Sequence, residues 1–237
     1  MVESRTDAGR AIEARRVLVN GVIADKSSRQ VHAGDAIVIE GPPPRFVSRG
    51  GDKLDAALQA FSIEVAGLRV LDAGASTGGF TDCLLQRGAA HVVALDVGHG
   101  QLHPRVRNDD RVTVLEHFHV RDAVPEAIGG RVQLVTADLS FISISRVLDA
   151  LIAACEPGGQ LVLLVKPQFE AGKIEVSRGH GVITDSVIHE RVRAEVHKAL
   201  TDRRCVVHGW VDSPIAGGDG NREFLVHATT ERSGFPA

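Results

Sequence analysis

The sequence predicts a doubly wound α/β domain preceded by a small α+β unit. Strand-like and helix-like segments alternate along most of the chain, and continuous apolar runs such as Leu161–Val165 are typical of parallel strands buried on both faces. Strands that alternate with helices in this way form an open parallel sheet with helices on both sides. Three consecutive prolines, Pro42–Pro44, favour an extended spacer and separate this domain from residues 1–41.

The composition is that of a globular chain with little net charge. Of the 237 residues, 43% are hydrophobic and 24% are charged, which argues against a disordered protein. The formal net charge of −3 argues against a surface built throughout for nucleic acid, although residues 1–53 carry nine Lys and Arg against seven Asp and Glu. Aromatic residues make up only 4%, so few side chains are present that could stack on the bases of a single strand.

Cysteine spacing and hydropathy argue against several further classes. Cys83, Cys155 and Cys205 are odd in number and have no CxxC spacing, so we expect neither a disulfide framework nor a cysteine-based metal site. The N-terminus lacks the apolar core of a secretory signal, and no apolar run approaches the ~20 residues of a membrane span. We therefore expect a soluble, cytoplasmic protein without a metal ion.

The N-terminal unit is expected over residues 1–41. Asp7–Arg16 has a helical pattern, Val17–Asn20 and Ala36–Ile39 are β-like, and an Asn-Gly pair marks a turn after the first strand. Residues 42–48 are the expected linker, and residues 49–237 the expected α/β domain.

In the α/β domain the predicted elements follow one another in a regular order. The expected strands are Arg69–Asp72, His91–Asp96, Val112–Leu115, Val132–Ala137, Gln160–Val165, Arg204–Trp210 and Glu223–His227. The expected helices are Gly50–Phe61, Gly79–Arg87, Ser145–Cys155 and Ser186–Thr201. Residues 211–222 leave no room for a crossover helix, so the last two strands should form an antiparallel hairpin.

A Gly-rich turn follows the first strand of this domain. In Val70–Thr81, read VLDAGASTGGFT, a hydrophobic strand runs into Asp72, then into glycines and a helix that begins near Gly79. Glycines allow positive φ and a close approach of a ligand. The GxxxGG spacing is neither the GxGxxG dinucleotide fingerprint nor a P-loop, so a mononucleoside ligand with a cationic sulfonium fits better than a pyrophosphate. An ordinary packing turn is the alternative.

Ionisable residues stand at the ends of the neighbouring strands. Asp96 ends the second strand and could accept hydrogen bonds from ribose hydroxyls, although an Asp there is commonly a helix cap. Asp138 and Lys166 end the fourth and fifth strands, and Asp138 is the natural partner of a lysine that leaves a buried strand. Lys53 and Glu223 could join them, or could be solvated surface charges.

Five motifs in order resemble the TlyA family, whose members are named hemolysin A or FtsJ-type ribosomal RNA 2′-O-methyltransferases. They are SRGGDKL, VLDAGASTGGFTD, ADLSFIS, LLVKPQFE and GNREFL, and the resemblance extends over nearly the whole chain. It implies a Rossmann-like class I methyltransferase sheet with an N-terminal S4-type RNA-binding domain. The segment RVLVNGVIADKSSRQVHAGDAIVI is similar to the second half of an S4 domain, and from this resemblance we expect the given sequence to begin at the second S4 helix.

The resemblance also implies the reaction and its residues. The family transfers a methyl group from S-adenosylmethionine to a ribose 2′-hydroxyl with a Lys-Asp-Lys-Glu tetrad, which by motif falls on Lys53, Asp138, Lys166 and Glu223. A protonated hydroxyl is a poor nucleophile, and a lysine can accept its proton only when neutral. We hypothesise that Lys166 accepts the proton or orients the hydroxyl, and that the other three residues position it.

Binding residues follow from the same motifs. The expected cofactor contacts are Asp72, Gly74, Ser76, Thr77, Gly78, Phe80, Asp96, Val97, Val120 and Asp138, with weaker adenine assignments for His119 and Asp122. The expected RNA contacts are Arg5, Arg10, Arg15, Arg16, Lys26, Arg45 and Arg49, with residues 174–183 as a further RNA-facing or mobile loop. The implied partner is a cytidine in ribosomal RNA of assembled subunits, and no oligomer is required.

Three other readings are weighed against this one. A membrane-active cytolysin is suggested by the family's hemolysin label, but the sequence has neither a span nor a strongly basic amphipathic helix. An NAD-dependent dehydrogenase is disfavoured by the GxxxGG turn. A non-catalytic Rossmann-type RNA-binding protein would share the fold but would not need the tetrad.

Overall fold

The computed structural model describes residues 8, 9, 11, 12, 14–42, 44–217 and 220–232. By its internal contacts the chain divides into two compact units, Met1–Arg45 and Phe46–Ala237. The expected linker over residues 42–48 straddles this division, because Phe46 and Val47 are buried in the core of the larger unit.

The small unit contains a three-stranded antiparallel sheet in the order β2-β1-β3. Its strands are β1 (Val17–Val19), β2 (Val22–Ile23) and β3 (Ile37–Ile39), and a left-handed Asn20 makes the tight turn after β1. Val17 and Val19 point to one face and form a small core with Ala11 and Ala24. The predicted strands are present, while β2 was not predicted. Of the predicted helix, residues 8, 9, 11 and 12 are helical.

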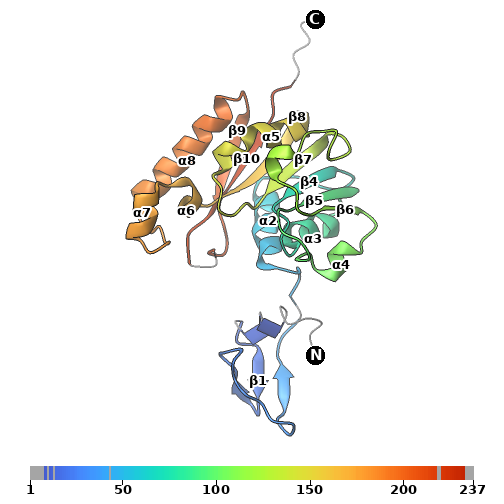
Figure 1. Ribbon diagram of the computed structural model, residues 1–237, viewed down its shortest axis with the longest axis vertical. Helices are drawn as coiled ribbons and strands as arrows, with labels where there is room; N and C mark the ends of the chain where they lie inside the picture. Colours follow the sequence, from blue (N-terminus) through green and yellow to red (C-terminus); the bar gives the residue numbers. More distant parts are fainter. Residues whose placement is uncertain (1–7, 10, 13, 43, 218–219, 233–237) are drawn as a thin grey trace, which may run out of the picture. The chain divides into compact units, whose positions relative to one another are not determined.

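The larger unit is built on a seven-stranded sheet in the order β6-β5-β4-β7-β8-β10-β9 (Figure 1). The strands are β4 (Arg69–Ala73), β5 (His91–Leu95), β6 (Val112–Leu115), β7 (Val132–Ala137), β8 (Cys155–Val165), β9 (Val206–Asp212) and β10 (Phe224–Thr229). Strands β4 to β8 are parallel, and β10 runs antiparallel to both β8 and β9. The doubly wound class and the terminal antiparallel hairpin are therefore confirmed.

The helices of the larger unit are α2 to α8. They are α2 (Arg49–Ala60), α3 (Gly79–Gln86), α4 (Pro104–Arg107), α5 (Leu148–Ala154), α6 (Pro167–Glu170), α7 (Lys173–Arg178) and α8 (Ser186–Thr201), with 3₁₀ turns at Val120–Asp122 and Ile144–Arg146. The short helices α4, α6 and α7 were not predicted. The prediction that a strand begins at Arg204 is wrong, because this residue has a φ of 60° and the strand begins at Val206.

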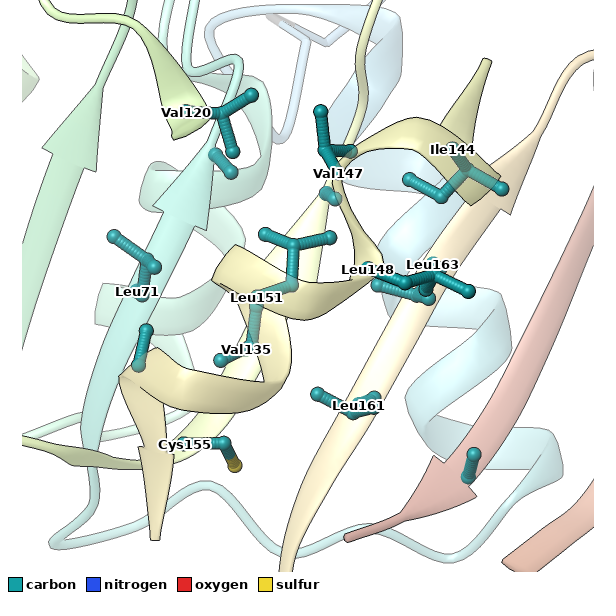
Figure 2. Packing of buried hydrophobic residues seen from close by; sticks show 14 of the residues in the cluster. Leu71, Val120, Val135, Ile144, Val147, Leu148, Leu151, Cys155, Leu161 and Leu163 are labelled. Atoms are coloured by element: carbon teal, nitrogen blue, oxygen red, sulfur yellow. The ribbon is translucent and has the colours of Figure 1, made fainter. Parts of the chain in front are cut away.

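Two hydrophobic clusters cover the two faces of the sheet. Leu71, Val135, Leu161 and Leu163 pack with α5 and α8 in one cluster, part of which Figure 2 shows. The residues between them on each strand, such as Val162, pack with α2 and α3 in the other cluster. Because successive side chains of a strand point to opposite faces, both faces of a doubly covered strand must be apolar. This explains the continuous apolar runs in the sequence.

Candidate functional site

A cavity of about 560 Å³ opens at the carboxyl edge of the sheet. Its walls come from the loops that follow β4, β5 and β7 and from the turn at Val120. The lining residues are Gly74, Ser76, Leu95, Asp96, Val97, Gln101, His119, Val120, Asp138, Leu139, Ser140, Phe141 and Ile142. Ligands of open α/β sheets bind at this edge.

The Gly-rich turn needs its glycines for conformation and for space. Gly74 has a φ of 85°, and a Cβ on it would lie 2.4 Å from the carbonyl oxygen of Asp138. Gly78 has a φ of 91°, and a Cβ on it would lie 2.8 Å from Leu102. The turn therefore packs directly against the loop after β7, and a side chain at Gly74 would separate the two walls of the cavity.

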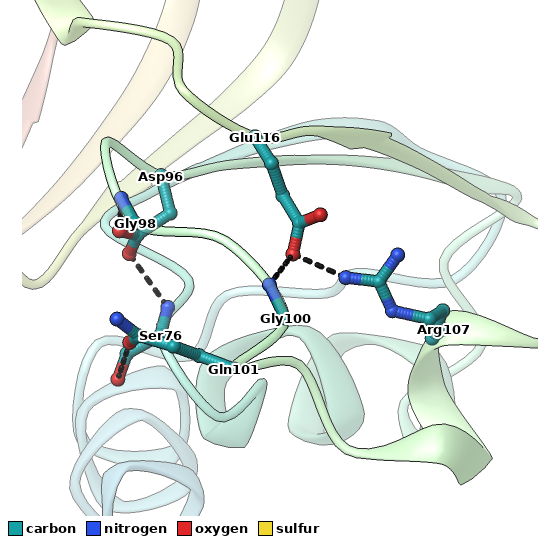
Figure 3. A network of polar contacts seen from close by, with 7 residues as sticks. All are labelled: Ser76, Asp96, Gly98, Gly100, Gln101, Arg107 and Glu116. Atoms are coloured by element: carbon teal, nitrogen blue, oxygen red, sulfur yellow. Dashed lines mark hydrogen bonds and ion pairs between the residues drawn. The ribbon is translucent and has the colours of Figure 1, made fainter.

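Asp96 joins the Gly-rich turn to the loop after β5. One carboxylate oxygen accepts the Ser76 N–H at 2.8 Å, and the other accepts the Gly98 N–H at 2.7 Å (Figure 3). Gln101, which the sequence did not single out, lies 3.3 Å from the Ser76 hydroxyl and also lines the cavity. Each carboxylate oxygen has capacity for a further donor, so Asp96 can both shape the turn and accept ligand hydroxyls.

Asp72 occupies a different place from the one expected. Its side chain is fully buried, and its carboxylate accepts hydrogen bonds from the hydroxyls of Thr81 at 2.6 Å and Thr136 at 3.2 Å. It does not line either described cavity of the cofactor region. Asp72 thus ties β4, β7 and the start of α3 together beneath the Gly-rich turn.

The four residues of the expected tetrad form two ion pairs. Lys53 Nζ lies 2.5 Å from Glu223 Oε2, and these side chains are 10% and 2% exposed. Lys166 Nζ forms an ion pair with Asp138 and donates to the Ser140 hydroxyl at 3.2 Å. Because a charged side chain is rarely buried without a partner, the pairing accounts for both lysines.

The strand registers bring these two pairs to one edge. Phe224 of β10 pairs with Val165 of β8, so the adjoining residues, Glu223 and Lys166, leave the sheet beside each other. Gly217 closes over Glu223, since a Cβ there would lie 2.5 Å from the carboxylate. Glu223 precedes an antiparallel strand rather than following a parallel one. The hairpin thereby places the Glu223 carboxylate at the same edge of the sheet as Asp138 and Lys166.

A second, smaller cavity of about 150 Å³ shares a wall with the large cavity and reaches Lys166. It is lined by Lys166 and by residues of the Gly-rich turn and of the first turns of α2 and α3: Ser48, Gly50, Ala75, Thr77, Gly79 and Phe80. Gly74, Ser76, Asp138 and Ser140 line both cavities. A ligand in the large cavity can therefore present a reactive group toward Lys166, and a second substrate can meet it there.

The loop after β7 was identified from sequence only by its motif, yet it forms much of the wall. Leu139, Ser140, Phe141 and Ile142 all line the large cavity. Phe141 is 91% exposed, has a φ of 64°, and its ring centroid lies 5.3 Å from that of Phe169. An aromatic side chain held in solvent beside a polar site offers a flat surface to a ligand.

The expected adenine residues are only partly at the cavity. His119 and Val120 line it, and His119 Nδ1 also accepts the Arg121 N–H at 3.0 Å as the cap of the 3₁₀ turn. Val97 is 63% exposed at the cavity. Asp122 does not line it, and Gly78 shapes the start of α3 without lining either cavity.

The expected RNA-contacting cations are in varied environments. Arg5 and Arg10 lie outside the described residues, whereas Arg15, Lys26, Arg45 and Arg49 are exposed. The Arg16 guanidinium donates to the carbonyl of Glu40 at 2.6 Å and to that of Gly41 at 2.8 Å. Arg16 therefore fastens the end of β3 within the small unit.

The expected loop at residues 174–183 is tied to the body of the larger unit. Asn221, which is 1% exposed, accepts the Ile183 N–H at 2.9 Å and donates to the Gly181 carbonyl at 2.9 Å. Part of the loop is the helix α7.

Among the described residues, no helix has the length and apolar character that a membrane span requires. Within the same residues, no three His, Cys, Asp or Glu side chains gather in a way that could hold a metal ion.

Comparison with known families and proteins agrees with this architecture. Residues 46–230 match the FtsJ-like methyltransferase family, and residues 1–37 match the S4 domain. The chain is 47% identical over 232 residues to the 16S/23S rRNA (cytidine-2′-O)-methyltransferase TlyA of Mycobacterium tuberculosis, with 98% of this chain and 86% of that protein covered. It is 39% identical to Hemolysin A of Brachyspira hyodysenteriae, with 95% and 93% covered.

Solved structures give the same grouping. A hemolysin-named protein from Streptococcus thermophilus superposes with a TM-score of 0.81 at 41% identity, with 100% of this chain and 87% of that chain covered. An S-adenosylmethionine-dependent methyltransferase from Mesorhizobium loti shares the fold at 17% identity and a TM-score of 0.53. With the family match, the near full-length relatives and the five motifs in agreement, this chain belongs to the TlyA family of FtsJ-like methyltransferases.

Proposed function

We propose that this protein methylates a ribose 2′-hydroxyl of a cytidine in ribosomal RNA and takes the methyl group from S-adenosylmethionine. The observation that carries the proposal is a nucleoside-sized cavity that reaches the Lys166–Asp138 ion pair, with Glu223 of the buried Lys53–Glu223 pair at the neighbouring position of the same sheet edge. The relatives' names supply the nucleotide class, because the TlyA protein of M. tuberculosis is named as a cytidine-2′-O-methyltransferase of 16S and 23S rRNA.

The residues of the large cavity fit S-adenosylmethionine. A volume of about 560 Å³ lies in the usual range of ~300–1,000 Å³ for small-molecule sites. Gly74 forms a cradle that a Cβ would fill, and Asp96 offers acceptors for ribose hydroxyls. We assign binding to these two and to Ser76, Thr77, Phe80, Val97, Val120 and Asp138, which line the cavities, and we assign to Asp72 and Gly78 the shaping of the turn. When bound, S-adenosylmethionine supplies an electrophilic methyl group on its sulfonium.

Lys166 is the proposed reactive side chain of the protein. It faces the small cavity, and its Nζ is oriented by Asp138 and Ser140. In its neutral form it can take the proton of the ribose hydroxyl, and in either form it can orient that hydroxyl. Glu223, which is paired with Lys53, leaves the sheet at the position next to Lys166, and we assign a positioning role to this pair.

The small unit is the proposed RNA-binding part. Its match to the S4 domain and its exposed Arg15, Lys26 and Arg45 support contacts with RNA phosphates, and Arg49 near the start of the larger unit adds to them. The two domains are proposed as residues 1–41 and 49–237. The proposed location is the cytoplasm, where ribosomal subunits are modified.

Methylation of isolated ribosomal subunits with labelled S-adenosylmethionine tests the function. The label should appear on a ribose 2′-oxygen of a cytidine, and mapping identifies the nucleotide. Lys166→Ala should lower kcat about 10²–10⁴-fold, the usual range for loss of an acid–base group, while the affinity for S-adenosylmethionine stays near that of the wild type.

Lys198→Ala is the matched control. This lysine is exposed and paired with Asp202 on α8, so its removal should leave the rate unchanged. No label on either subunit would contradict the proposed function, and near-normal transfer by Lys166→Ala would contradict the assignment of Lys166.

A further inference from the structure

The wall formed by residues 139–144 has little backbone support of its own. Among the described residues, the amides of 139–143 donate no backbone–backbone hydrogen bond, in contrast to Asp138, whose N–H bonds the Ala73 carbonyl at 3.0 Å. Yet this segment lines both cavities and carries the exposed Phe141 in a left-handed conformation. Its arrangement must therefore come from side-chain contacts.

The polar and aromatic contacts of the wall come from one short segment, Lys166 and the helix α6 that follows it, while Leu139 and Ile142 also pack against the core. Lys166 binds Asp138 and Ser140 at the near end of the wall, and Phe169 meets Phe141 in the middle. Glu170 holds the far end. One of its carboxylate oxygens accepts the Ser143 hydroxyl at 2.6 Å, and the other accepts the Ile144 N–H at 2.7 Å.

We propose that Glu170 is a positioning residue for the methyl transfer, because its carboxylate locks the far end of the 139–144 wall to the segment that carries Lys166. The inference rests on the proposed function and adds a residue to it. Without the lock, the Phe141 surface and the Ser140 hydroxyl lose their fixed relation to Lys166.

The energetics of the carboxylate agree with a dedicated role. Burial raises the pKa of Glu170, while the hydrogen bonds from Ser143 and Ile144 oppose the rise. A partly buried carboxylate with both oxygens engaged is costly to desolvate, and removing it leaves the Ile144 N–H without its acceptor. A short helix after a catalytic strand would not need this group for packing alone.

A double-mutant cycle between Glu170 and Phe141 tests the proposal on the full chain. Glu170→Ala should lower kcat/KM for ribosomal subunits about tenfold, since small misplacements of reacting groups are expensive. In the Phe141→Ala background, Glu170→Ala should lower kcat/KM less than about threefold, because the effects of mutating two residues that act through one another are not additive. Glu170→Gln, whose amide can still accept from Ile144 N–H, should keep most of the activity.

Controls separate the lock from folding and from the proposed function. Glu231→Ala removes an exposed glutamate that pairs with Arg204 and should change nothing. If Glu170→Ala does not fold, Ser143→Ala replaces it in the same cycle with a smaller expected loss. The proposal would be overturned if the double mutant's loss of kcat/KM equalled the product of the losses of the two single mutants. It would also be overturned if Glu170→Ala kept the kcat/KM of the wild type.

An inactive wild type would instead reject the proposed function. The contribution of the Glu170 contacts with Ser143 and Ile144 is then measured by equilibrium binding of S-adenosylmethionine, because residues 139–142 of the wall line its proposed cavity. Glu170→Ala should weaken that binding by at least about threefold if the wall depends on the lock, and unchanged affinity would overturn the lock.

Discussion

Asp72 is a carboxyl group enclosed beneath the Gly-rich turn, where water cannot reach it. Burial raises its pKa to about 7, the nearby Asp138 carboxylate adds to the rise, and the hydrogen bonds from Thr81 and Thr136 oppose it. A group that resists ionisation so strongly is a cost to the fold at neutral pH. The hydrogen bonds by which Asp72 joins β4 to β7 and to α3 offset that cost.

Asp72→Asn should change how stability depends on pH. In the wild type, between the reference pKa of 3.8 and about 7, the unfolded chain loses a proton that the folded chain keeps, so stability falls as pH rises through this window. The full penalty, about 4 kcal/mol from the shift of some three units, persists above it. The stability of Asp72→Asn minus that of the wild type should therefore rise from pH 4 to 7 and then level off.

Urea denaturation of both proteins across that range is the measurement. Asp149→Asn is the control, because Arg203 lowers the pKa of this exposed carboxyl and its removal should produce no such rise. A difference between wild type and Asp72→Asn that does not vary with pH would contradict the assignment.

At the scale of elements, the first turns of α2 and α3 touch each other beside the small cavity. A Cβ on Gly79 would lie 2.0 Å from the Ser48 hydroxyl and 2.9 Å from the Gly51 nitrogen. A Cβ on Gly51 would lie 2.3 Å from the Phe46 ring. Gly79 is therefore needed for the close approach of the two helices, and Gly51 for the close approach of Phe46 to α2.

Gly79→Ala should destabilise the larger unit by about 1–3 kcal/mol, the usual cost of overpacking a tight site. Because the same contact borders the small cavity, the affinity for S-adenosylmethionine should fall as well. Gly209→Ala is the control, since the nearest atom to its added Cβ is Phe61 Cε1 at an ordinary 3.5 Å. Chemical denaturation and equilibrium binding check both variants, and equal stabilities would show that the helices can separate at no cost.

At the scale of the whole molecule, the chain combines a small and a large compact unit with different tasks. The small unit has few buried apolar residues, namely Ala11, Val17, Val19 and Ala24 among those described, and units of this size seldom have a sufficient core. The net charge of −3 comes from the larger unit, because residues 1–45 carry seven Lys and Arg against six Asp and Glu. A whole-chain charge therefore conceals the part proposed to meet RNA.

Residues 46–237 expressed alone should bind S-adenosylmethionine with the affinity of the full chain, because every residue of the two cavities lies within them. Their kcat/KM for ribosomal subunits should fall at least about tenfold, since phosphate contacts supply much of the affinity for nucleic acids. Filter binding at several salt concentrations checks the loss of cationic contacts. Full activity of the shortened protein would show that the small unit takes no part in substrate recognition.

Much of the fold could be predicted from local patterns because those patterns have local causes. Runs such as Leu161–Val165 must be buried on both faces, and α8 runs over the predicted Ser186–Thr201, with Asp185 accepting the Val187 N–H as its cap. The short helices α4 and α6 could not be predicted, because four residues are too few to show the hydrophobic periodicity of a helix. The start of β9 could not be predicted because it depends on the left-handed Arg204.

The sequence by itself determined the order of the motifs, and with it the family and the carboxyl edge at which a ligand binds. Only the tertiary structure decided which residues meet there. It placed Asp72 below the cavity, paired Lys53 with Glu223 across 170 positions, and joined Glu170 to Ser143 and Ile144. Motifs record the chemistry each segment carries, whereas contacts between distant segments depend on strand register and on close packing, which no local pattern encodes.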